Sequence, residues 1–209
     1  LFLIKIIMKK SIILLTLTLI FGPQFILQSQ DKFSKRKIEN LKEQVSLLVE
    51  EDKKFTQVMI DKVFSFGELG FQEFETSKYL GKILEENGFD VEYQISGIPT
   101  SWLATWSNGE GGPTIAMGSD FDGVPSTSQY PGVAYEKPLV DGAPGHGEGH
   151  NIGLPIVITS AIAIKKIMIE NNINGKLVLW PGVAEEILGA KAWYVRDGYF
   201  DNVDMCIFT

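Results

Sequence analysis

The sequence predicts an α/β fold in which a mostly parallel sheet carries helices on its faces. In the second half of the chain, short apolar runs alternate with helical patterns in the order strand, helix, strand, helix, strand. With 209 residues, of which 44% are hydrophobic, the chain is long enough to bury one sizeable core. Two of the apolar runs are followed by pairs of carboxylates, as expected where the strands of an open α/β sheet end.

Residues 1–30 have the pattern of a signal peptide. A methionine and two lysines at 8–10 precede the apolar stretch 11–21, and polar residues follow it. Residues 1–7 lie before that methionine and are compatible with upstream read-through. A membrane anchor is the alternative, but the uninterrupted apolar run is short for a membrane span. We therefore expect cleavage, a periplasmic or secreted location and no stable membrane anchor.

Two helical regions are expected before the first strand. Residues 31–64 are charged, but their apolar side chains recur at helical spacing and form one face. Residues 73–86 repeat this pattern, and the Asn87-Gly88 pair supplies a stop. The rest of the chain alternates between the two kinds of element. Strands are expected at 89–94, 101–106, 113–117, 176–180 and 203–208, helices at 152–170 and 187–196, and a loop at 126–141.

Charge and cysteine content exclude some classes of protein. The net charge is −7, and no cluster of lysine or arginine suggests a nucleic-acid partner. Cys206 is the only cysteine, so a disulfide within the chain is impossible. It lies in the apolar run 203–208 with no activating neighbour in the sequence, and we expect a buried core thiol rather than a nucleophile.

The loop 141–151 holds both histidines of the chain, His146 and His150, with Glu148 between them. Imidazole nitrogen and carboxylate oxygen on one short loop are ligands that zinc and similar divalent metals prefer. The glycines of the loop would also suit a phosphate, but neither G-x-G-x-x-G nor Gly-Lys-Ser/Thr is present. A flexible glycine turn with two surface histidines is the remaining alternative.

Carboxylates follow two of the expected strands. Asp120 and Asp122 come after strand 113–117, and Glu185 and Glu186 come after the strand at 176–180. An Asp-rich turn and a solvated helix start are the structural alternatives. In the predicted layout, however, both pairs and the histidine loop fall at sheet ends. One glutamate can then bind a metal while its neighbour handles a proton, the minimum for metal-assisted hydrolysis.

Four segments resemble the M20 metallopeptidases and, within them, the aminobenzoyl-glutamate-type amidohydrolases. They are Gly-Ser-Asp-Phe-Asp-Gly-Val-Pro, Gly-His-Gly-Glu-Gly-His-Asn, Pro-Gly-Val-Ala-Glu-Glu and Val-Arg-Asp-Gly-Tyr-Phe-Asp-Asn-Val-Asp. The likeness runs from about residue 64 to residue 209. It implies a zinc-peptidase-like catalytic domain with two zinc ions in the complete enzyme, other divalent metals being an alternative. Residues 31–209 would be the N-terminal part of that domain, truncated before a lid or dimerisation domain.

The resemblance also assigns roles to single residues. His150 and Glu186 match metal ligands, and Glu185 matches the general base that takes a proton from the metal-bound water. Glu148 stands where relatives have a cysteine ligand or a bridging aspartate, and it is expected to bind the metal through oxygen. Asp122 matches an aspartate that supports the site from behind the ligands.

Two positions are less defined. Asp120 stands where many members have a histidine ligand, so its binding to metal is open, whereas His146 is not expected to be a ligand. The family continues beyond its last matching strand into a further histidine ligand.

The function that the resemblance implies is hydrolysis of the amide bond of an N-acyl or N-aroyl amino acid by a metal-activated water, in a protein that dimerises when complete. The alternatives are a non-catalytic partner subunit or inactive remnant that keeps the fold, and a dipeptidase of the same family that takes short peptides.

Overall fold

The computed structural model describes residues 33–209, and the expected signal peptide lies outside them. Residues 39–209 form one compact unit. Its five strands are β1 (Asp90–Tyr93), β2 (Trp102–Asn108), β3 (Thr114–Asp120), β4 (Gly175–Gly182) and β5 (Met205–Phe208). The helices of the described chain are α2 (Lys35–Glu51), α3 (Lys53–Phe66), α4 (Phe74–Glu86), α5 (His150–Glu170) and α6 (Lys191–Arg196), with short 3-10 turns η1 (Ile95–Gly97) and η2 (Glu185–Ile187).

The strands form one sheet in the order β1-β2-β4-β3-β5. Strand β3 pairs in parallel with both β4 and β5, whereas β2 pairs antiparallel with β1 and β4. Only β2 therefore runs against the other four strands. The α/β fold class and the mostly parallel sheet are confirmed, with this single reversal near the β1 edge.

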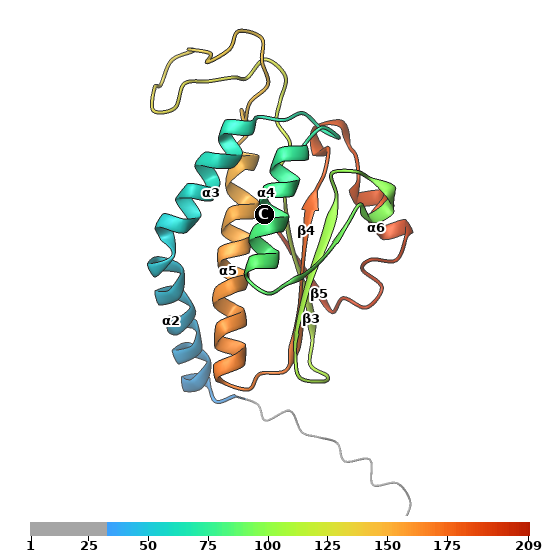
Figure 1. The fold of residues 1–209 in the computed structure, drawn as a ribbon. Helices are drawn as coiled ribbons and strands as arrows, with labels where there is room; N and C mark the ends of the chain where they lie inside the picture. The colour runs from blue at the N-terminus through green and yellow to red at the C-terminus, as the bar shows by residue number, and fades with distance from the viewer. Residues whose placement is uncertain (1–32) are drawn as a thin grey trace, which may run out of the picture. The chain divides into compact units, whose positions relative to one another are not determined.

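Helix α5 is the core helix of the unit. It packs on β3 and β4, and α4 packs on β1 and β2, so both cover the same side of the sheet, with α3 beside them and α6 on the other side (Figure 1). Leu154, Ile158 and Ala161 of α5 are fully buried. By length and composition α5 could also cross a membrane, but half of its most apolar window is buried inside the protein. Its apolar character is explained by the sheet beneath it.

Three local expectations are wrong. The helical stretch 31–64 is broken at Asp52 into α2 and α3. The helix expected at 187–196 begins only at Lys191, because Leu188 and Ala190 adopt positive φ angles that no α-helix contains. Cys206 is exposed rather than buried, since β5 is an edge strand of the sheet and all four of its residues are exposed.

Candidate metal centre

The carboxyl ends of β3 and β4 meet at one edge of the sheet. The two strands are parallel and in register, with Asp120 opposite Gly182. The chain after β3 therefore brings Asp122 to this edge, and the chain after β4 brings the η2 turn with Glu185 and Glu186. Asp122 and Glu186, which are 64 residues apart in the sequence, become neighbours, as the sequence pattern predicts.

His150 is the first residue of α5, which places its ring over the same edge. The Nδ1 atom lies 3.1 Å from the backbone oxygen of Asp122 and 3.3 Å from Oδ1 of its carboxylate. Asp122 is only 1% exposed, so this contact is shielded from water. An Nδ1–H that donates to Asp122 leaves the Nε2 lone pair free for a metal, the arrangement found behind many metal-binding histidines.

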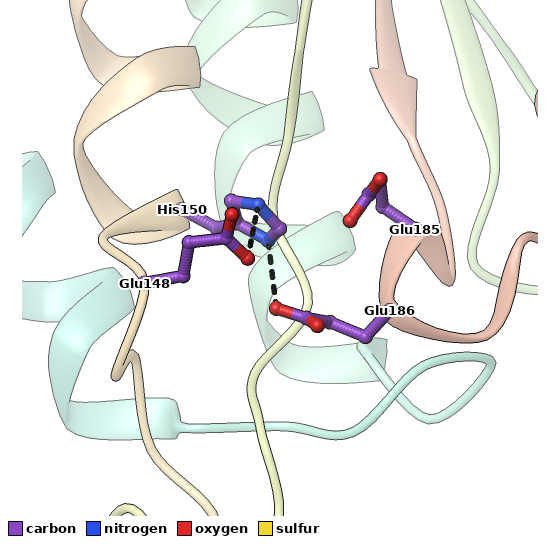
Figure 2. Close-up of side chains that lie close together, drawn as sticks. All are labelled: Glu148, His150, Glu185 and Glu186. Carbon is purple, nitrogen blue, oxygen red and sulfur yellow. Dashed lines mark ion pairs between the residues drawn. The ribbon is translucent and has the colours of Figure 1, made fainter.

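His150 and three carboxylates converge at this edge of the sheet. Ligand atoms of Glu148, His150, Glu185 and Glu186 all lie within 4.8 Å of one another. Figure 2 shows the imidazole between the carboxylates of Glu148 and Glu186, which lie 3.6 Å from Nε2 and 4.0 Å from Nδ1. Ligands around a tetrahedral zinc ion are about 3.3 Å apart, so a small contraction would bring this set to bonding distance.

Electrostatics at the cluster favour a cation. The hydrogen bond to Asp122 raises the pKa of His150 to about 9, against the opposing effect of burial. Burial, and then the neighbouring Glu148, raise the pKa of Glu186 to about 6. The Oε1 atom of Glu186 is buried and accepts no hydrogen bond from residues 33–209. A carboxylate that lacks a donor and faces a second carboxylate is a suitable ligand for a divalent metal.

Asp120 pairs with a lysine rather than with the converging side chains. Its oxygens lie 2.8 Å and 3.0 Å from the Nζ atom of Lys191, and it is absent from the converging set. Burial raises the pKa of Asp120, and the lysine opposes that effect. Gly182 makes room for the pair, because a Cβ there would lie 1.8 Å from Oδ1 of Asp120 and 2.9 Å from Cε of Lys191.

His146 is not among the converging side chains and contacts α3 instead. It is buried, and its Nε2 atom lies 3.1 Å from the backbone oxygen of Val63 in α3. Burial lowers its pKa, so a neutral ring is expected. The contact of His146 with Val63 therefore links the histidine loop to α3.

Sequence reasoning missed two charged residues near the cluster. Lys191 resembled any exposed helix lysine, and only the fold shows that it reaches Asp120. Glu73 resembled a solvent-facing acid ahead of α4, yet it is fully buried and accepts a hydrogen bond from the backbone of Ala184. The pattern offered no sign of either contact, because the partners are 71 and 111 residues away in the sequence.

A cleft of about 500 Å³ opens beside the converging residues. Its lining includes Glu148, His150 and Glu185 as well as the apolar side chains of Ile152, Ile156 and Phe208. The cleft therefore offers both charged and apolar contacts to a molecule bound in it. Taken together, the fold and this site define the class of protein: an α/β protein with a candidate metal-binding site of carboxylates and one histidine at the end of its sheet.

Comparison with known proteins narrows that class. The chain is 31% identical over 159 residues to a p-aminobenzoyl-glutamate hydrolase subunit of Escherichia coli, a match covering 76% of this chain and 33% of the relative. It is 31% identical to hippurate hydrolase of Campylobacter jejuni, over 66% of this chain and 33% of the relative. It thus spans about a third of the length of these curated relatives. No protein-family model matches the chain.

The solved structures agree on the fold. A dinuclear metal-binding peptidase of the M20 family from Bacillus subtilis superposes with a TM-score of 0.56 at 23% identity, over 75% of this chain and 43% of the other. The chain belongs to the M20 family of metallopeptidases and amidohydrolases and is similar to its aminobenzoyl-glutamate type.

Proposed function

We propose that the complete protein is a metal-dependent amidohydrolase that cleaves the amide bond of N-acyl or N-aroyl amino acids. The observation that carries the proposal is the convergence of Glu148, His150, Glu185 and Glu186 at one sheet edge. The names of the relatives support the substrate class, since one acts on p-aminobenzoyl-glutamate and another on hippurate. The structural relative that binds two metals supports the cofactor, and zinc is our proposal for its identity.

Three side chains would hold the metal, and one would move a proton. His150 offers Nε2, and Glu148 and Glu186 offer carboxylate oxygens. A zinc ion held there would supply Lewis acidity, the chemistry that makes a water more acidic and an amide carbonyl more electrophilic. Glu185 accepts the proton of the attacking water and returns it to the leaving amine. Asp122 keeps His150 in the tautomer whose Nε2 atom is free.

The apolar part of the cleft would receive the acyl or aroyl group. Ile152 and Ile156 lie one turn apart on α5, beyond the His150 end, and Phe208 faces them from β5. The amide bond would then lie over Glu185 while the hydrophobic group is buried away from the carboxylates.

A non-catalytic partner subunit is the second candidate. The Escherichia coli relative is named as a subunit, which is the observation in favour of this alternative. Dimerisation of the complete protein, export directed by residues 1–30 and the division of the chain into a signal segment and part of a catalytic domain remain proposals as well.

The roles of the adjacent glutamates provide the test. Glu186→Gln should lower the metal content, because a neutral amide oxygen is a poorer ligand than a carboxylate. Glu185→Gln should keep metal and fold but reduce turnover by about two to four orders of magnitude. Both variants are made in the complete protein, with metal analysis after dialysis and hydrolysis of p-aminobenzoyl-glutamate as the readouts.

Each outcome separates the candidates. If Glu185→Gln loses metal while Glu186→Gln keeps it and stops turnover, the two roles are reversed. A parent protein that binds metal tightly but hydrolyses neither p-aminobenzoyl-glutamate nor hippurate supports the alternative of a non-catalytic partner.

A further inference from the structure

Glu73 is a carboxylate buried in a place where a polar group is costly. It lies immediately before α4 and is 0% exposed. Burial raises its pKa, and both of its side-chain hydrogen-bond partners are uncharged. A buried acid without a basic partner destabilises a fold unless its oxygens are well bonded. Its contacts therefore indicate what the carboxylate does.

Both oxygens of Glu73 accept a hydrogen bond. Oε2 accepts the hydroxyl of Thr100 at 2.8 Å, and Oε1 accepts the backbone N–H of Ala184 at 2.9 Å. Ala184 is fully buried and has a positive φ of 55°, a conformation that needs support in a residue with a side chain. Thr100 fixes one end of the carboxylate, and the other end holds this strained residue.

Ala184 directly precedes the two glutamates of the candidate metal centre. Two residues further along, the backbone N–H of Glu186 donates a hydrogen bond to Oδ2 of Asp122 at 3.1 Å. Two buried carboxylates, Glu73 and Asp122, thus hold the backbone on either side of Glu185. The start of the turn is also tightly packed, because a Cβ on Gly70 would lie 2.9 Å from Cα of Ala184.

We propose that Glu73 is a positioning residue for the metal centre, acting through the backbone of Ala184 to fix the directions of Glu185 and Glu186. The inference rests on the proposed function only in taking these two glutamates as metal ligand and base. It identifies a group that touches neither metal nor substrate and yet sets the geometry of both carboxylates.

Three variants of the full-length protein separate positioning from general stability. Glu73→Met removes both acceptors at similar volume, whereas Glu73→Gln keeps a carbonyl for the Ala184 N–H and an amide that can donate to Thr100. Leu84→Ala is the matched control, because it leaves a cavity in the same helix, α4, at a fully buried position outside the turn.

Two readouts are taken below the unfolding temperature of every variant. Amide hydrogen exchange of residues 183–188 is measured on metal-free protein, where Glu73→Met should exchange about tenfold faster than the parent. Zinc affinity by competition with a chelating dye should fall about tenfold to a hundredfold in Glu73→Met, the usual loss when a group behind a metal ligand is removed. Glu73→Gln should keep both the exchange rate and the zinc affinity close to those of the parent, and Leu84→Ala should change neither.

The outcomes are decisive for each claim. Exchange and affinity in Glu73→Met equal to those of Leu84→Ala would overturn the positioning role. If Glu73→Met does not fold, Thr100→Val replaces it, since losing the hydroxyl frees Oε2 and should shift both readouts in the same direction. A parent that binds no zinc refutes the proposed metal centre, while exchange at residues 183–188 still decides whether Glu73 holds the turn.

Discussion

Replacing Asp122 with asparagine should release His150 from the contact that keeps it protonated. The carboxylate of Asp122 is the main cause of the raised pKa of His150, and burial of the ring acts in the opposite direction. Asparagine would keep its oxygen toward the N–H of Glu186, because that donor is fixed by the turn. Its NH₂ group would then oppose a proton on Nδ1 of His150, and only the backbone oxygen of residue 122 would remain to accept a hydrogen bond there. The variant therefore weakens the preference for the tautomer whose Nε2 lone pair is free for a metal.

The size of the effect follows from the two pKa values. Moving the pKa of His150 from 6.5 to about 9 corresponds to about 3 kcal/mol of interaction with the protonated ring. Because the pKa is raised in the folded state, this stabilisation is fully present below pH 6.5 and is lost as the pH rises through about 9. Asp122→Asn should therefore destabilise the metal-free protein by up to about 3 kcal/mol at about pH 6 and by much less at about pH 10.

The assay is an NMR titration of the imidazole protons in metal-free protein. The chain contains only His146 and His150, so two imidazole rings are followed, and a His150→Gln variant assigns their signals. In Asp122→Asn the midpoint of His150 should move from about 9 toward or below the ordinary value of 6.5. Burial is the largest cause of the lowered pKa of His146, and Asp122 has a smaller, opposing effect, so the midpoint of His146 should move less than that of His150. An unchanged His150 midpoint would refute the idea that Asp122 holds this ring.

Three further predictions concern the metal and the N-terminus. Zinc affinity should rise about tenfold per pH unit between pH 6.5 and 9, because zinc must displace one proton from His150. Calorimetry in buffers of different ionisation enthalpy would count the protons released on binding. A count near zero would contradict the assignment of His150 as a ligand. Glu148→Cys should shift metal preference from manganese toward zinc, since a thiolate is the softer ligand, as metal analysis after loading with an equimolar mixture would show. Intact-mass measurement of protein recovered from an exporting host should reveal loss of the segment before Asp31, and a mature species that retains Met8 would exclude cleavage.

The sequence predicts those parts of the site that depend on where strands end. Asp122 and Glu186 are close because β3 and β4 are parallel neighbours, and apolar runs followed by carboxylates are a local signal of that arrangement. Likewise, His150 lies at the start of a long apolar helix, so its position at the sheet edge follows from α5 packing on the sheet. These placements need only the period of the hydrophobic pattern and the direction of the chain.

What could not be predicted depends on contacts between distant segments. Glu73 reaches Ala184 across 111 residues of sequence, and no local pattern distinguishes a buried glutamate from a solvated one. The exposure of Cys206 follows from β5 being at the edge of the sheet, which is a matter of strand order rather than of composition. The break before α6 arises from positive φ angles at Leu188 and Ala190, residue types that give no warning of it.

The contact between Asp120 and Lys191 counts against Asp120 as a metal ligand, a role that residue type leaves open. As an aspartate at a strand end it is a chemically reasonable metal ligand, but its side chain is only 10% exposed and both oxygens contact the ammonium of Lys191. Binding a metal would require it to give up that partner in a partly buried site, where an ion pair is strongly coupled. Lys191 is further held over the ring of Phe208, 4.4 Å from its centroid. The lysine thus balances the charge of Asp120, whereas within residues 33–209 the carboxylates of Glu148, Glu185 and Glu186 have only the ring of His150 as a cationic neighbour and keep an excess of negative charge.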